Sequence, residues 1–232
     1  MNKALANCGH CPVEKKKNRF CNNLKGEGPK NCPTLRYRAL AKEMLASMDP
    51  AELHFSRMAS IQEASGQGCT EEGNPGKPYK PRIVEIVEFC RRMKYRTIGL
   101  IFCGGSIAET DVVQEIMETN GLQVVSVICK VGCIPKASLG LKNTDINMRN
   151  ENGSMCNPLV QAAVVNAAKV DFNVLINLCV GHDSLILKHL DAPATVFCVK
   201  DRLLGHNPIQ AVYLYDTYYN YLKKPLEGID AL

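Results

Sequence analysis

Four short apolar runs in the second half of the chain have the length of buried β-strands. They lie at 97–103, 123–129, 173–179 and 195–199. Apolar residues with helical spacing occupy the stretches between and after them, at 106–120, 158–168, 183–190 and 208–223. Because strands that alternate with helices are typical of βαβ units, the pattern predicts an α/β fold. We expect a Rossmann-like parallel sheet of about four strands with flanking helices.

Upstream of the strands, from 34 to 95, the spacing of apolar residues is helical. Helices are expected at 34–48, 50–64 and 80–93, with a loop rich in glycine and proline between the second and the third. Thr34 is placed to cap the first of these helices. The third carries Cys90 on its apolar stripe, so we interpret Cys90 as a core residue.

The first 33 residues follow neither pattern. They are rich in cysteine, glycine, asparagine and lysine and poor in branched aliphatic residues, so they offer too little apolar surface for a core. We therefore expect three parts in the chain. These are a cysteine-rich metal-binding segment at 1–33, a helical region at 34–95 that packs on the core, and a Rossmann-like domain at 96–232.

The cysteines of the first segment have the spacing Cys8-x2-Cys11-x9-Cys21-x10-Cys32, followed by Pro33. Four thiols in a short segment can supply a complete tetrahedral ligand set, and the metal would then take the place of the missing core. The Cys–Pro ending is similar to the last ligand of bacterial ferredoxin motifs, which favours a 4Fe–4S cluster, although the spacing here is wider. A structural Zn²⁺ site is the alternative, because zinc also takes four thiolates.

A second group of cysteines belongs to the α/β half. Each predicted strand carries one at or near its C-terminal end, namely Cys103, Cys129, Cys179 and Cys198. In open parallel sheets this is the edge where ligands bind. Two more thiols point to the same edge, because Cys133 follows the second strand and Cys156 lies at a predicted helix start, which stabilises a thiolate.

We predict a site for a second metal, cluster or other cofactor at this edge, formed by Cys103, Cys133, Cys156 and Cys179. For Cys129 and Cys198, burial as small apolar residues is an equally good interpretation.

The motif Cys179-Val180-Gly181-His182-Asp183 lies where a predicted strand ends and a helix begins. Gly181 permits close approach of the backbone to a ligand, and His182 follows the cysteine by three residues. We therefore predict Cys179 and His182 as catalytic residues. The loops at 104–106, 200–202 and 205–208 are candidates for binding an anion.

Composition narrows the range of partners. The net charge is +5, but aromatic residues make up only 6% and tryptophan is absent, so we expect no nucleic-acid partner. The apolar runs are far shorter than the roughly 18 residues of a membrane span, so we expect no membrane either. Twelve cysteines in a chain without the apolar core of an export signal favour metal or thiol chemistry in the cytoplasm over disulfides.

Five motifs spread over most of the chain belong together. They are the N-terminal cysteines ending in Cys32-Pro33, then Cys129-Lys130-Val131-Gly132, Met155-Cys156-Asn157-Pro158, the stretch 179–185, and 199–202 with His206-Asn207-Pro208. In these motifs the chain resembles domain-of-unknown-function family 1847. Members of that family are prokaryotic and are labelled only as metal-binding. The resemblance therefore implies metal binding and leaves the reaction open.

Three hypotheses follow for the function. In the first, the chain is an iron–sulfur redox protein whose N-terminal cluster passes electrons to a second centre at the sheet edge. It would serve an electron-transfer partner or a small-molecule substrate. In the second, it is a non-catalytic protein that binds or senses zinc or another soft metal. In the third, it is a thiol enzyme with Cys179 as the nucleophile and His182 as the base.

Overall fold

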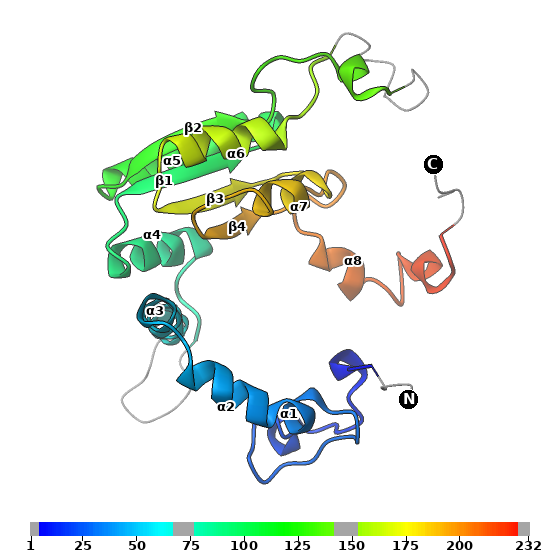
Figure 1. The fold of residues 1–232 in the computed structure, drawn as a ribbon. Coiled ribbons are helices and arrows are strands. Elements are labelled where there is room, and N and C mark those ends of the chain that lie inside the picture. The colour runs from blue at the N-terminus through cyan, green and yellow to red at the C-terminus, as the bar shows by residue number, and fades with distance from the viewer. Residues whose placement is uncertain (1–4, 67–76, 142–152, 227–232) are drawn as a thin grey trace. The chain divides into compact units, whose positions relative to one another are not determined.

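The structure is a computed structural model and describes residues 5–66, 77–141 and 153–226. The chain divides into two compact units, Met1–Arg57 and Met58–Leu232 (Figure 1). The boundary falls within helix α3 (Pro50–Gly66), so the helical region expected at 34–95 contributes to both units. Within the described ranges, no helix combines the length and the apolarity that a membrane span needs.

The second unit is built on a parallel sheet of four strands, as the alternating pattern predicts. They are β1 (Thr97–Phe102), β2 (Gln123–Ile128), β3 (Phe172–Ile176) and β4 (Ala194–Cys198). Their order across the sheet is β2-β1-β3-β4. Strand β2 pairs with one side of β1, and the next strand along the chain, β3, pairs with the other side. The strand order therefore reverses between β1 and β3 (Figure 1). Ligands of open α/β sheets bind at the carboxyl ends of the strands beside such a reversal.

Helices cover both faces of this sheet. The first face packs against α4 (Arg82–Arg92) and α5 (Ile107–Thr119), and the second against α6 (Pro158–Ala167) and α7 (His182–Leu187). Successive β1 residues alternate between the two cores, with Leu100 in the first cluster and Ile101 in the second. All five residues of β3 are buried, as expected of a strand covered on both faces.

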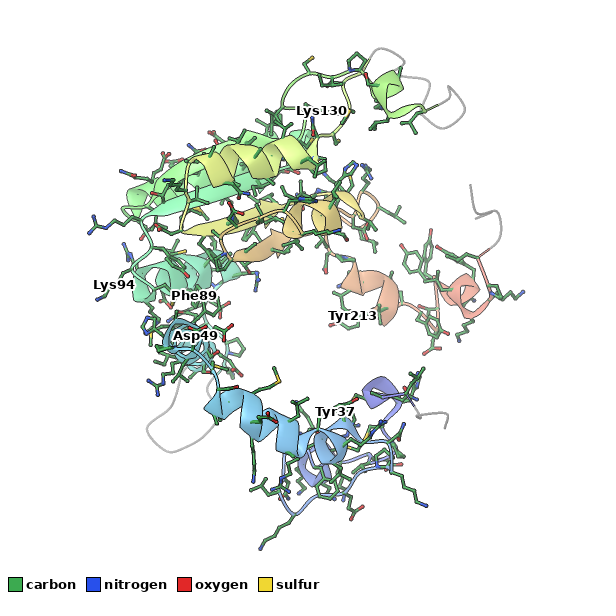
Figure 2. The ribbon with its side chains drawn as sticks, in the orientation of Figure 1. Tyr37, Asp49, Phe89, Lys94, Lys130 and Tyr213 are labelled. Carbon is green, nitrogen blue, oxygen red and sulfur yellow. The ribbon has the colours of Figure 1, made fainter. Side chains whose placement is uncertain are left out.

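Cys90 lies within the first of these cores and is 0% exposed, which confirms its interpretation as a core residue. Burial raises the pKa of its thiol to about 12, so Cys90 stays protonated at neutral pH. Beside it, the ring of Phe172 contacts the rings of Phe89 and Tyr95, with centroids 5.6 and 5.5 Å away. In Figure 2, Phe89 is labelled on α4.

One buried side chain ties α6 to the carboxyl ends of β1 and β2. Gln161 donates from Nε2 to the carbonyl oxygens of Phe102 (3.2 Å) and Val127 (3.0 Å). Both strands therefore end in positions fixed relative to the first turns of α6.

Two helices differ from the expectation. The helix expected at 34–48 consists of α1 (Pro33–Arg36) and α2 (Arg38–Ala46), interrupted at Tyr37, and it begins with proline at its first position rather than with Thr34 as a cap. The helix expected at 208–223 is reduced to α8 (Ile209–Tyr213) and the 3₁₀ helix η7 (Asn220–Lys223). The residues between these two include aspartate, threonine and tyrosine, which favour helix only weakly.

Candidate functional site

The N-terminal unit holds together without a core. None of the described residues between 5 and 57 is buried. Backbone hydrogen bonds close its loop instead, from Phe20 N–H to Glu27 O (3.0 Å) and from Glu27 N–H to Asn18 O (2.7 Å). The Arg19 side chain adds a bond from Nε to Val13 O (2.8 Å). Such a segment gains little stability from burial of apolar surface.

All four N-terminal cysteines line one pocket of about 70 Å³ in this unit, which we call the N-terminal pocket. Cys8 lies in the 3₁₀ helix η1 (Cys8–His10), and Cys32 directly precedes α1. Cys11 and Cys32 are half-buried, whereas Cys8 and Cys21 are exposed. Glycine at position 28 leaves room for the Cys32 thiol, because a Cβ there would lie 3.1 Å from Cys32 Sγ.

A second pocket, of about 400 Å³, opens at the carboxyl edge of the sheet, and we call it the sheet-edge pocket. Residues that follow all four strands line it, together with Cys156 from the start of α6. The lining residues are Cys103, Gly104, Gly105, Ile128, Cys129, Lys130, Cys156, Cys179, Lys200 and Arg202. It therefore lies at the reversal of strand order, where the fold class places its ligands.

Three sulfur atoms are close together in the sheet-edge pocket. Cys103 and Cys129 each follow the last residue of a strand, and those residues, Phe102 and Ile128, are partners in the β1–β2 register. The Cys156 thiol donates to Cys129 Sγ at 3.7 Å. Cys156 is held there because the N–H of the next residue, Asn157, donates to Cys129 O (2.8 Å).

Three basic side chains line the sheet-edge pocket. Arg202 donates from its guanidinium to Cys179 Sγ at 3.2 Å. Lys200 and Lys130 also line the pocket, whereas no aspartate or glutamate is among the lining residues. Lys130, labelled at this edge in Figure 2, donates from Nζ to Ser154 O (2.5 Å).

The pKa values of Cys103 and Cys129 are shifted in opposite directions. The pKa of Cys103 is lowered to about 5, first because Cys129 donates a hydrogen bond to it and then because of the Gly105 N–H and the charge of Lys200. The pKa of Cys129 is raised, chiefly because its proton is held by Cys103. At neutral pH, Cys103 is therefore the thiolate and Cys129 the thiol.

We expect this ionisation to be visible in the reactivity of Cys103. Because its pKa is depressed, the thiolate is present above about pH 5 and is lost as the pH falls through that value. The rate of alkylation of Cys103 by iodoacetamide, followed by peptide mass spectrometry, should be nearly constant between about pH 8 and pH 6. In the urea-unfolded chain the same rate should fall roughly tenfold per pH unit. A tenfold fall per unit in the folded protein would contradict the assignment of the thiolate to Cys103.

The structure brings together only part of the predicted set. Cys103, Cys156 and Cys179 line the sheet-edge pocket, but Cys133 and His182 do not. Cys133 is exposed. It lies in a turn after β2 in which both Gly132 and Cys133 have positive φ. His182 is the first residue of α7, and its backbone N–H donates to Cys179 O (3.0 Å).

Cys129 and the three cations complete the sheet-edge pocket, although no prediction from the sequence selected Cys129. A signal for it was present. Cys103 and Cys129 each lie six residues after the first residue of their strands, Thr97 and Gln123, which are register partners. Equal spacing on adjacent parallel strands makes the two cysteines neighbours.

No group of three or more histidine, cysteine, aspartate or glutamate side chains is arranged to hold a metal ion in the part of the chain that the structure describes. The roles predicted for the individual cysteines and for His182 therefore stay predictions.

Comparisons with known proteins agree with the resemblance seen in the motifs. The family model described as a protein of unknown function, DUF1847, matches residues 32–197. An uncharacterised protein of Methanocaldococcus jannaschii is 43% identical over 149 residues, which are 64% of this chain and 73% of that protein. The cysteines of the sheet-edge pocket lie within the matched range, whereas Cys8, Cys11 and Cys21 precede it.

Proposed function

We propose that this chain, which belongs to the DUF1847 family of proteins of unknown function, is a metal-binding redox protein with two cysteine-lined sites. One observation carries the proposal. Of the eleven cysteines in the described residues, four line the N-terminal pocket and four line the sheet-edge pocket. Buried apolar packing does not require such grouping, whereas ligand sets and reactive thiol pairs do.

The N-terminal pocket is proposed to hold an iron–sulfur cluster through Cys8, Cys11, Cys21 and Cys32. The four thiols are the complete ligand set of such a cluster. Since a buried water needs about 10–15 Å³, the 70 Å³ between the thiols is room for several atoms rather than one. A bound cluster would supply one-electron transfer.

Zinc is the second candidate for the N-terminal pocket. Four thiolates at about 2.3 Å satisfy Zn²⁺ completely, and the unit lacks buried residues, as do small domains that fold around zinc. With zinc in this pocket, the protein would be a non-catalytic binder or sensor of soft metals.

The sheet-edge pocket is proposed as the second centre, where electrons would reach a small-molecule substrate or a protein partner. In one version of the proposal the pocket binds a second metal or cluster. In the other it binds none, and its cysteines react as free thiols. In the third hypothesis, Cys179 is the nucleophile and His182 its base. Arg202 is the side chain that donates to the Cys179 sulfur, whereas His182 contacts Cys179 through its backbone N–H. The arrangement therefore favours Cys103, which carries the lowered pKa, over Cys179 as the reactive thiol.

The proposal is tested by metal analysis of the full chain purified without oxygen. We expect broad visible absorbance, with iron and acid-labile sulfide in comparable amounts and little zinc. The variants Cys11→Ser and Cys32→Ser should lose most of the iron. Cys198→Ala, which removes a strand-end thiol that lines neither pocket, should retain it.

Each alternative gives a different result. Stoichiometric zinc without iron would contradict the iron–sulfur cluster and support a zinc site in the N-terminal pocket. Wild-type protein without bound metal, or iron that survives both N-terminal substitutions, would defeat the proposed role of these four cysteines.

A further inference from the structure

We propose that Cys103 and Cys129 form a dithiol that reduces small anionic disulfides, with Cys103 as the attacking thiol and Cys129 as the resolving thiol. The inference rests on the proposed redox function and names the substrate class of its sheet-edge pocket.

The backbone places the two cysteines side by side at the ends of adjacent strands. Cys129 N–H donates to Phe102 O (2.9 Å), which continues the β1–β2 ladder to its end. Adjacent strands lie about 4.7–4.9 Å apart, and disulfides join residues whose Cα atoms are about 4.4–6.8 Å apart. Neighbouring residues in a parallel register also direct their side chains to the same face. A disulfide between them thus requires only small rotations of the side chains.

Exposure decides which thiol attacks. Both cysteines line the pocket, but Cys103 is half-buried whereas Cys129 is only 3% exposed. Gly104 N–H donates to Cys129 Sγ at 3.2 Å, which fixes that sulfur beside Cys103. A disulfide that enters from the pocket therefore meets Cys103 first.

The reaction balances with the disulfide R–S–S–R′ as the oxidant. The Cys103 thiolate attacks one substrate sulfur, the substrate S–S bond breaks, and R′S⁻ leaves with the electron pair and takes the proton of Cys129. The Cys129 thiolate then attacks the Cys103 sulfur, forms the Cys103–Cys129 disulfide and releases RS⁻. Two electrons pass from the protein to the substrate, and an external dithiol reverses the protein's oxidation.

The charge of the sheet-edge pocket selects the substrate class. Of the described residues that line it, three are cations and none is a carboxylate, so it attracts anions and repels cationic disulfides. Gly105 lies beside both Lys200 and Cys103, because a Cβ built on it would be in ordinary contact with Lys200 Nζ (3.6 Å) and Cys103 Sγ (4.0 Å). A disulfide bearing carboxylates could thus place them against Lys200 and Arg202 while its sulfur reaches Cys103.

The test exposes the reduced full chain, without oxygen, to one of two probes, glutathione disulfide (anionic) or cystamine (cationic). Free thiols are then blocked, and disulfides are mapped by peptide mass spectrometry. With glutathione disulfide we expect a Cys103–Cys129 disulfide. Cys129→Ser should instead accumulate glutathione on Cys103, and Cys103→Ser should form neither product. Cys198→Ala should behave as wild type.

The preference for anionic disulfides is tested by the reaction rates with the two probes. Arg202→Gln should slow the reaction with glutathione disulfide by at least about fivefold and leave or raise the rate with cystamine. Equal effects on the two probes would overturn the substrate class. Glutathione that accumulates first on Cys179, or a disulfide between Cys129 and Cys156, would overturn the assignment of roles.

Metal measured in the same samples separates this inference from the proposed function. If the N-terminal pocket proves to be metal-free while the Cys103–Cys129 disulfide forms, only the metal proposal fails. If iron is bound at the N-terminal cysteines but Cys103 and Cys129 stay unreactive because a metal occupies the sheet-edge pocket, only the dithiol fails.

Discussion

Removal of metal is expected to make the segment from Asn7 to Pro33 at least about a hundredfold more sensitive to trypsin. The reason is that none of the described residues of this unit is buried, so that in the proposed metal-bound form the free energy of metal binding would be the main source of order. The lysines at 15, 16 and 17 provide cleavage sites within the segment.

The measurement is limited trypsin digestion of the metal-bound and the chelated protein, with cleavage sites identified by mass spectrometry. Sites in the second unit are the internal control, because its core between the sheet and the helices does not depend on the N-terminal cysteines. Equal protection of Lys15–Lys17 before and after chelation would mean that the backbone hydrogen bonds alone order this segment.

Gly99→Ala is expected to lower the free energy of unfolding of the second unit by about 2–4 kcal/mol. Gly99 lies in the middle of β1, where a Cβ would overlap Asn173 Oδ1 and come within 3.0 Å of Val165 Cγ1. Asn173 is 0% exposed and donates to Ala192 O (3.2 Å), so it cannot move aside into solvent. Denaturant titration followed by circular dichroism measures the effect.

A double-variant cycle separates this overlap from the general cost of adding a methyl group. Asn173→Ala removes the overlapping oxygen, which has no hydrogen-bond partner among the described residues. Gly99→Ala should therefore cost at least about 1 kcal/mol less in the Asn173→Ala background. Additive effects of the two substitutions would show that Val165, rather than Asn173, sets the cost.

The fold was accessible from the sequence because its strongest signals are local. Strands such as β3 are continuous apolar runs, the pattern expected of a strand that is buried on both faces. Segments with the apolar spacing of a helix alternate with these strands. The errors occurred where the local signal was weak. The break at Tyr37 interrupts a continuous helical pattern, and the region between Tyr213 and Asn220 has apolar spacing but poor helix formers.

The sheet-edge pocket was predicted in part for the same reason. A residue at or shortly after the end of a parallel strand lies at the carboxyl edge, so Cys103, Cys129 and Cys179 could be placed there from the strand limits alone. Beyond a turn the direction of the chain depends on backbone angles, and the positive φ at Cys133 is unusual for a residue other than glycine. That Cys129 is the neighbour of Cys103 follows only from the strand register, which no single strand reveals.

The bridge from Gln161 to Phe102 and Val127 also bears on how strongly a Cys103–Cys129 dithiol would reduce its substrates. It fixes the ends of both strands immediately before the two cysteines, so closing the ring between the sulfurs costs little further conformational entropy. The effective molarity of Cys129 toward Cys103 is correspondingly high. A high effective molarity favours the oxidised form of a dithiol and lowers its reduction potential, which opposes the rise in potential that a stabilised Cys103 thiolate causes.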